Sequence, residues 1–284
     1  MRVLKFGGSS LADFACLKQV AQLVKVQLKD EMLLVLSAPG GMTDSLVALA
    51  SAAEQGFDFS EQWQALVSRC EGLKADVEKS GVVVTSWPNL GELKNKLDGV
   101  SLIQCCPDQV RAFVISFGER VSVSLMQALL NSHDARYLEA TSCIASTGGY
   151  IDAEADLVTS KARFQAVLKE NPATIYIMPG FTASNDKGEL TTLGRNGSDY
   201  SAAIAAACLG AEICQIWTDV DGVYSADPRY IKKATKVDFY LIKKRWSYLT
   251  LALKCFILKQ FYRALKRAYR AKLKTRTTLM LKAL

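Results

Sequence analysis

The segment TIYIMPGFTASNDKGELTTLGRNGSDYSAAIAAACL, residues 174–209, decides the fold class. It begins with an apolar, β-rich run, Thr174–Met178, and passes through a glycine-rich polar stretch. It ends in an alanine-rich run, Ser201–Leu209, which predicts a helix. A strand followed by a helix is the repeating unit of a parallel sheet, so this segment predicts an α/β protein.

The same alternation extends along the chain in both directions. Four more runs predict strands, namely Val3–Phe6, Leu33–Ser37, Phe113–Ser116 and Ile213–Thr218. Five amphipathic runs predict further helices, namely Leu17–Leu28, Thr43–Glu54, Glu61–Lys79, Glu119–Leu130 and Val158–Lys169. We therefore expect an α/β fold with a largely parallel central sheet, helices on both faces, and ligands bound at the carboxyl ends of the strands.

Glycine-rich turns follow two of the predicted strands. In KFGGSS, Lys5–Ser10, backbone amides could cradle phosphate oxygens and the lysine could neutralise their charge, although a purely structural turn fits nearly as well. The segment is not a Walker A loop, because the GxxxxGK[ST] pattern is absent. LSAPGGMTDS, Leu36–Ser45, repeats the arrangement, with Thr43 or Asp44 as the expected helix cap.

Several polar residues stand where strands give way to helices. Glu119, in FGER, could bind an ammonium group, although an acid at a helix start is the simpler interpretation. Arg195, between glycines, suits capture of a carboxylate. Ser198 or Asp199 could cap the next helix, whose free N–H groups suit phosphate. The loop WTDVDGVYSADPR, residues 217–229, offers acids for Mg²⁺ or its waters, unless it is an ordinary surface loop.

Composition argues against several other classes of protein. The sequence has no apolar run of about eighteen residues, and MRVLKFGG predicts a strand and a turn rather than a signal peptide. The eight cysteines form no CxxC pair and the chain has a single histidine, so a zinc site is not expected. Buried free thiols in a cytoplasmic protein are the expectation instead.

Five segments in this order resemble the aspartokinases of the amino-acid kinase superfamily: KFGGSS, SAPGGMTD, FGER, GFTASNDKGELTTLGRNGSDYSAA and IWTDVDGVYSADPR. The resemblance covers residues 1 to about 238 and is most like the kinase part of bifunctional aspartokinase/homoserine dehydrogenases. It implies an αβα sandwich with two lobes. It also implies ATP-dependent phosphorylation of L-aspartate to 4-phospho-L-aspartate, the first step toward threonine, methionine and lysine, in a cytoplasmic parent enzyme that forms homo-oligomers.

The resemblance also implies roles for individual residues. The ATP phosphates would be bound by Lys5 and the backbone of Gly7, Gly8, Ser9 and Ser10. Aspartate would be held by Thr43, Glu119, Arg195 and Ser198. Asp199 would organise the reacting centre together with Lys5. The nucleotide would also contact Thr218, Asp219, Tyr224 and Arg229. ATP would act with Mg²⁺, and no residue is assigned as a direct metal ligand. A glutamate-specific kinase is the close alternative.

The C-terminal part of the chain differs sharply in charge. Residues 1–229 carry a net charge of −8 and residues 230–284 a net charge of +15, which together give the formal +7 of the chain. Such a tail could bind nucleic acid or anionic membranes, but it contains no recognised motif. Codons for Trp246–Phe261 can be chosen so that moving the frame back by one base gives MELSYFGAKVLHPKTI, which resembles the segment that continues the kinase domain in the family.

We therefore expect a catalytic domain over residues 1–238 and a non-native tail over residues 239–284, with the frame slipping near Asp238–Tyr240. The segment restored in the other frame would contain a lysine that family members use near the nucleotide phosphates, and this lysine is missing from the chain as given. The alternative to an active kinase is consequently a catalytically dead fragment of a bifunctional enzyme.

Overall fold

The computed structural model describes residues 1–28, 30–218, 223–224, 236–237 and 271–275. Its centre is a six-stranded sheet in which every paired strand is parallel to its neighbour. The strands, in spatial order, are β12 (Ala271–Thr275), β9 (Ile213–Thr218), β1 (Arg2–Phe6), β2 (Met32–Leu36), β6 (Ile175–Pro179) and β3 (Ala135–Tyr137). The expected parallel sheet is confirmed.

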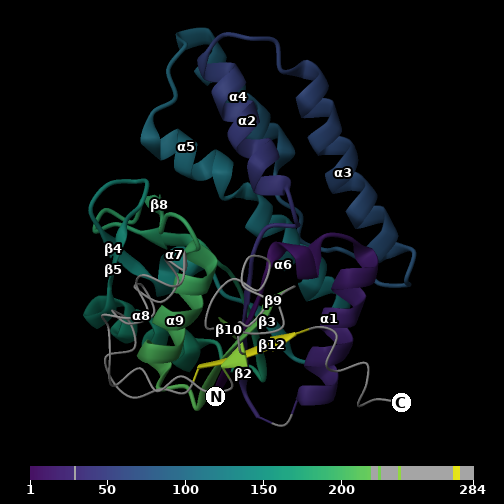
Figure 1. The fold of residues 1–284 in the computed structure, drawn as a ribbon, viewed down its shortest axis with the longest axis vertical. Coiled ribbons are helices and arrows are strands. Elements are labelled where there is room, and N and C mark those ends of the chain that lie inside the picture. Colours follow the sequence, from purple (N-terminus) through teal and green to yellow (C-terminus); the bar gives the residue numbers. More distant parts are fainter. Residues whose placement is uncertain (29, 219–222, 225–235, 238–270, 276–284) are drawn as a thin grey trace.

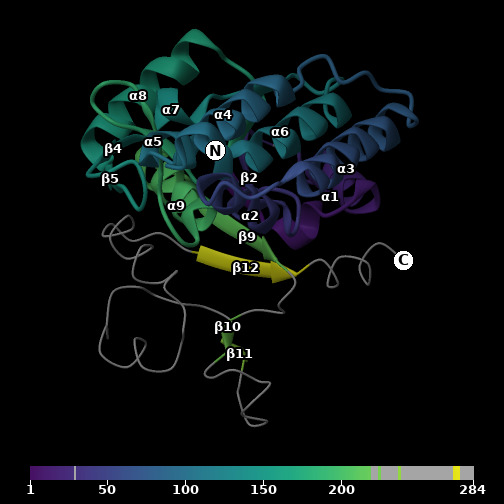
Figure 2. The same ribbon diagram turned by 90° about the horizontal axis from the view of Figure 1, so that it is seen from above.

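Helices cover both faces of this sheet (Figures 1 and 2). In chain order they are η1 (Gly8–Leu11), α1 (Phe14–Gln27), α2 (Met42–Glu54), α3 (Ser60–Glu78), α4 (Leu90–Ile103), α5 (Asp108–Ile115), α6 (Phe117–Leu129), α7 (Ala140–Cys143), α8 (Leu157–Glu170) and α9 (Gly197–Leu209). Figure 1 shows α2, α3, α4 and α5 gathered above the central sheet, while α7, α8 and α9 lie beside it. This arrangement agrees with the expected αβα sandwich and its two lobes.

Side chains alternate between the two faces of the central sheet, so the core consists of two clusters, one on each face. Leu4 and Phe6 of β1 face one cluster, which also contains buried residues of α1, α2, α3, α4 and α6. Val3 faces the other cluster, with Leu33 and Val35 of β2 and the alanines of α9. Because side chains alternate across a strand, Lys5 lies on the same face as Val3, toward α9. The sheet thereby presents a charged side chain to the start of that helix.

A smaller sheet of short strands accompanies α8 and α9. Its order is β5 (Glu154–Asp156), β4 (Ala145–Thr147), β7 (Thr182–Ser184) and β8 (Leu190–Thr192). β7 and β8 form a hairpin through the polar turn at residues 185–188, within the glycine-rich stretch that follows β6. The remaining described pair, β10 (Val223–Tyr224) and β11 (Lys236–Val237), is antiparallel.

One predicted strand is wrong. Phe113–Ser116 is not extended: its first three residues end α5, which begins at Asp108 after Pro107. A short apolar run does not distinguish a strand from a buried helix by periodicity alone. Here the helix is favoured because Val114 packs in the core and because Arg111 Nη2 lies 2.6 Å from Glu54 Oε2 on α2.

Both expected helix caps are also wrong. α2 follows Gly41 and α9 follows Asn196, and both of these residues have left-handed backbones with φ of 78° and 58°. Among the described residues, no side chain caps either helix. Thr43, Ser198 and Asp199 instead lie inside the first turns, which leaves their side chains free for other contacts.

Candidate functional site

The loops that leave β1 and β2 meet at the carboxyl edge of the sheet. The Gly40 amide donates a hydrogen bond to the Gly8 carbonyl over 2.9 Å, and the Gly7 amide donates to the Trp217 carbonyl over 3.0 Å. A Cβ atom on Gly8 would lie 2.9 Å from the Ala38 carbonyl oxygen. The approach of two backbones therefore requires glycine here. Gly7, Gly8, Ser9 and Ser10, predicted to bind phosphate, all lie at this edge.

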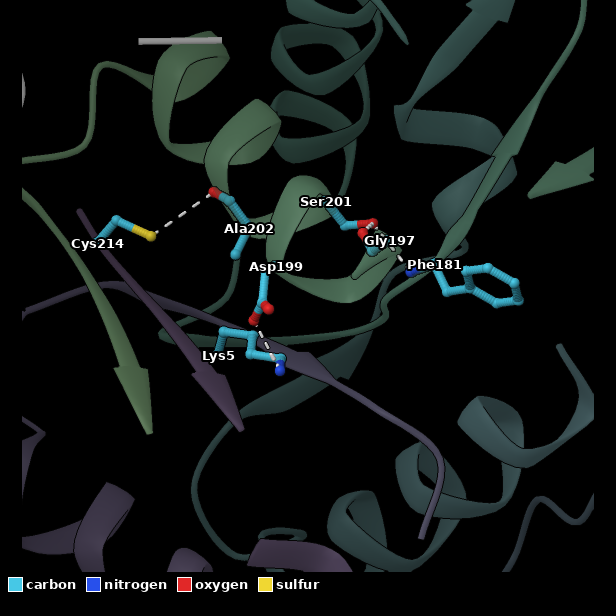
Figure 3. A network of polar contacts seen from close by, with 7 residues as sticks. All are labelled: Lys5, Phe181, Gly197, Asp199, Ser201, Ala202 and Cys214. Atoms are coloured by element: carbon cyan, nitrogen blue, oxygen red, sulfur yellow. Dashed lines mark hydrogen bonds and ion pairs between the residues drawn. The ribbon is translucent and has the colours of Figure 1, made fainter. Parts of the chain in front are cut away.

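Lys5 and Asp199 form a buried ion pair at the same edge (Figure 3). Lys5 Nζ lies 2.7 Å from Asp199 Oδ1, and each residue is only 7% exposed. Oδ1 has no hydrogen-bond partner of good geometry within the described chain, so the contact is mainly electrostatic. A lysine held in this way is placed where its ammonium group could also contact an incoming phosphate. The structure thus brings together the two residues predicted to be catalytic.

Glu119 supplies a second buried carboxyl group next to this pair. It lies in the first turn of α6 and is 3% exposed. Burial raises the pKa of Glu119 to about 8, against the opposing effects of the Ala38 and Glu119 backbone amides and of the Lys5 charge. Its Oε2 atom has no partner among the described residues. An unpaired carboxyl oxygen in a buried site is suited to a ligand that carries a cation.

The loop that follows β6 also lies at the carboxyl edge of the central sheet. The Gly180 amide donates to the Leu36 carbonyl over 2.8 Å, which ties this exit to β2. A Cβ atom on Gly180 would lie 2.6 Å from Ser198 Cβ, so the start of α9 packs directly on the β6 exit. Ser198 is 8% exposed and precedes Asp199. Lys5, Glu119, Ser198 and Asp199 therefore converge on the carboxyl ends of β1, β2 and β6.

Two of the predicted substrate residues lie nearby without polar partners. Thr43 is partly exposed in the first turn of α2, and Arg195 is exposed just before α9. In the part of the chain that the structure describes, neither side chain makes a hydrogen bond or an ion pair. Their predicted contacts with substrate remain predictions.

The predicted nucleotide residues after β9 are only partly described. Thr218 ends β9, beside the β1 exit, because Trp217 pairs with Phe6 in the parallel register and their rings stack with centroids 6.0 Å apart. Tyr224 belongs to β10. Asp219 and Arg229 lie outside the described residues.

Sequence reasoning missed residues that act through tertiary contacts. Arg69 of α3 donates from Nη2 to the Gly40 carbonyl over 2.5 Å and so holds the loop after β2. Ser201 Oγ accepts a hydrogen bond from the Phe181 amide. Phe181 has a φ of 70°, which is unusual for a residue other than glycine. No local pattern marks Arg69 or Ser201. Phe181 could have been suspected from the Pro-Gly-Phe turn after the strand.

Other site types find no support in the described residues. They contain no group of three or more histidine, cysteine, aspartate or glutamate side chains that could hold a metal ion. Of their seven free cysteines, six are buried and Cys105 is exposed, while Cys255 lies outside the described chain.

No described helix combines the length and the apolar character needed to cross a bilayer.

Known proteins resemble this chain in sequence and in fold. Residues 1–240 match the amino acid kinase family. The chain is 37% identical over 246 residues to a bifunctional aspartokinase/homoserine dehydrogenase of Haemophilus influenzae, covering 82% of this chain and 30% of that protein. It is 33% identical to lysine-sensitive aspartokinase 3 of Escherichia coli, covering 83% of this chain and 53% of that protein. The chain thus spans between about a third and about half of these relatives.

Among solved structures, Escherichia coli aspartokinase III in complex with aspartate and ADP superposes with a TM-score of 0.71 and 30% identity, covering 84% of this chain and 53% of that one. The aspartate kinase of Clostridium acetobutylicum has the same fold, with a TM-score of 0.76 at 21% identity, over 97% of this chain and 60% of that one. With a family match over most of its length and these structural neighbours, the chain belongs to the amino acid kinase family.

Proposed function

We propose that this protein transfers the γ-phosphoryl group of ATP to the side-chain carboxylate of L-aspartate. The observation that carries the proposal is the buried Lys5–Asp199 pair, which lies beside two glycine loops at the carboxyl edge of the sheet. The similarity to aspartokinases, one of which was solved with aspartate and ADP, supports the choice of substrates. The reaction would take place in the cytoplasm.

The proposed roles follow from position. Lys5 and the backbone of Gly7–Ser10 would bind the ATP phosphates. The Gly8 and Ser9 amides would be the donors, because the Gly7 and Ser10 amides already donate to the Trp217 and Gly7 carbonyls. Glu119 would accept the ammonium group of aspartate, Arg195 would pair with a carboxylate, and Thr43 and Ser198 would donate hydrogen bonds. Asp199 would hold Lys5 in place during transfer. Thr218, Asp219, Tyr224 and Arg229 would contact the rest of the nucleotide.

Little acid–base chemistry is required of the protein. The side-chain carboxylate of aspartate has a pKa of about 3.9 in short peptides and is ionised at neutral pH. One of its oxygens forms a bond to the γ-phosphorus while the bond from that phosphorus to the bridging oxygen breaks, and ADP leaves with the electron pair. The protein aligns the two oxygens and neutralises the phosphoryl oxygens.

Magnesium fits this site as a companion of ATP. The cluster contains two buried carboxyl groups, Asp199 and Glu119, and burial keeps Glu119 protonated near neutral pH. Such a site suits Mg²⁺ that keeps most of its ligands from water and phosphate, with Asp199 as the available protein carboxylate. When bound, the ion neutralises charge on the phosphate oxygens.

The test is a turnover assay with the purified chain, ATP, Mg²⁺ and L-aspartate, in which hydroxylamine traps the acyl phosphate as aspartyl hydroxamate. We expect hydroxamate with L-aspartate and much less with L-glutamate. A preference for L-glutamate would reassign the substrate. No hydroxamate at high enzyme concentration would favour the alternative of a catalytically dead fragment.

The glycine contact between the two loops yields a further prediction. Gly8→Ala should raise the KM for ATP about tenfold or more, because its Cβ would push against the Ala38 carbonyl and displace amides that bind phosphate. Steady-state kinetics at varied ATP would measure this effect. The matched control is Gly99→Ala in α4, where an added Cβ would lie within 4 Å of no atom of the described residues outside that helix. An unchanged KM in Gly8→Ala would remove this loop from phosphate binding.

We also propose that residues 239–284 come from a shifted reading frame and that the native domain continues in the other frame. The support is the net charge of +15 over residues 230–284, together with the alternative decoding of the tail. Within residues 239–284, five residues form β12, and the others lie outside the described chain. Sequencing the DNA across the codons for Val237–Leu241 tests the proposal. One additional T would support the proposal. An unchanged sequence would reject it if the downstream codons, read in the other frame, do not encode the family segment.

A further inference from the structure

The chain leaves β6 through a strained three-residue turn. The Thr182 amide donates to the Gly180 carbonyl over 2.8 Å, and the central residue, Phe181, has a φ of 70°. A turn of this kind with positive φ is rare and is unfavourable for a residue that carries a Cβ atom. Surrounding contacts must therefore hold Phe181 in this conformation.

The side chain of Ser201 makes the contact that can do so (Figure 3). Ser201 is fully buried, and its Oγ accepts a hydrogen bond from the Phe181 amide over 2.9 Å. The same hydroxyl donates to the Gly197 carbonyl over 2.9 Å. A serine hydroxyl commonly bonds to the carbonyl four residues earlier in a helix. The second bond, to a residue 20 positions away, makes this one a tertiary link.

Close packing makes this link sensitive to position. A Cβ atom on Gly197 would lie 2.5 Å from Phe181 Cδ2, so the turn and the first turn of α9 are in direct contact. The same helical turn carries Ser198 against Gly180 and carries Asp199 to Lys5. Any movement of the turn away from α9 would therefore change the placement of both residues.

We propose that Ser201 is a positioning residue that fixes the β6 exit against the start of α9 and thereby sets the geometry of the Lys5–Asp199 pair. The inference rests on the proposed function for its kinetic consequence, because Asp199 there holds the phosphate-binding Lys5 and Ser198 donates a hydrogen bond to aspartate. Its structural part, protection of the Phe181 amide by Ser201, does not depend on the reaction.

The experiment compares three substitutions of Ser201 with a matched control in another helix. Ser201→Ala removes both hydrogen bonds, Ser201→Thr keeps the hydroxyl, and Ser201→Cys keeps the shape with a weaker acceptor. The control is Ser124→Ala in α6. Ser124 Oγ donates to the Arg120 carbonyl over 3.0 Å, which is the same bond within a helix without the tertiary link.

We expect Ser201→Ala to lower kcat about tenfold to a hundredfold, since a buried amide loses its partner, while the KM for ATP changes little. Ser201→Thr should restore most of kcat, and Ser124→Ala should match the parent protein. Residue-resolved hydrogen exchange should show faster exchange of the Phe181 amide in Ser201→Ala but not in Ser201→Thr or Ser124→Ala. If Ser201→Ala does not fold, Ser201→Cys decides in its place by the same two measurements.

Equal kcat in Ser201→Ala and Ser124→Ala would overturn the proposal, and so would an unchanged exchange rate at Phe181. If the parent protein forms no aspartyl hydroxamate, the proposed function fails, whereas the exchange rates still decide whether Ser201 holds the turn. The two failures are thus separable.

Discussion

Replacing Lys5 by methionine should lower kcat/KM for the proposed reaction by about 1,000-fold. Methionine fills a similar volume but carries no charge, so the transferring phosphoryl group loses a cation in a buried site, where such contacts are strongest. The change also leaves Asp199 buried without its ion-pair partner. Removing one partner of a buried pair typically costs about 3–5 kcal/mol in the free energy of unfolding. Hydroxamate kinetics and thermal unfolding measure the two effects.

A second substitution separates the two losses. In the double variant Lys5→Met/Asp199→Asn, neither buried group is charged, so the free energy of unfolding should recover while kcat/KM stays low. The single variant Asp199→Asn should keep part of the activity if its role is to position the lysine. Double-variant activity within about tenfold of the parent would show that Lys5 does not act on the phosphoryl group, and would point to a structural pair.

The fold was largely predictable because its central strands are buried on both faces. Such strands are nearly continuous apolar runs, and Met32–Leu36 and Ile175–Pro179 are fully buried along their length. The short strands of the second sheet have three residues each, too few for a periodic signal. The run Phe113–Ser116, which overlaps the end of α5, was predicted as a strand because a short apolar run carries no helical period of its own. The helix is stabilised instead by Val114 in the core and by the ion pair between Arg111 and Glu54.

The site was predictable where chemistry and turn signals coincide in the sequence. Lys5 stands before the glycine turn that follows β1, and Asp199 stands at the start of α9. The roles of Arg69 and Ser201 were not predicted, because their hydrogen-bond partners are 29 and 20 residues away in the sequence. Arginine and serine are also ordinary residues in a helix. Glu119 was predicted to bind a ligand, but its raised pKa follows from burial in the first turn of α6, where the preceding Gly118 packs against Ala38 and Met42. No spacing in the sequence reveals this packing.

That raised pKa should make aspartate binding depend on pH. Burial raises the pKa of Glu119 to about 8, so the free protein holds this carboxyl group protonated at pH 6–7. An ammonium group prefers the carboxylate, and binding must therefore release the proton. The KM for L-aspartate should fall by up to about tenfold per pH unit between pH 6 and pH 8 and level off above. In Glu119→Gln the KM should be raised about a hundredfold and should lose this dependence.

The same titration should appear in stability without any substrate. In the unfolded chain the carboxyl group of Glu119 has the ordinary glutamate pKa of 4.5, whereas burial raises its pKa to about 8 in the folded protein. Between these values the folded state holds a proton that the unfolded state has released. The free energy of unfolding should therefore decrease as pH rises through this window, by at most about 1.4 kcal/mol per pH unit. Because glutamine mimics the protonated form, Glu119→Gln should unfold less readily than the parent at pH 8.

Glu189 provides the matched control for both measurements. Hydrogen bonds from Asn185 and Tyr150 lower its pKa, so it titrates at lower pH than Glu119 and keeps its charge between pH 6 and pH 8. Glu189→Gln should leave the slope of stability against pH in that range unaltered, whereas Glu119→Gln should flatten it. A slope that persists in Glu119→Gln would assign the titration to another group. A KM for L-aspartate that remains independent of pH in the parent protein would mean that Glu119 does not bind the ammonium group.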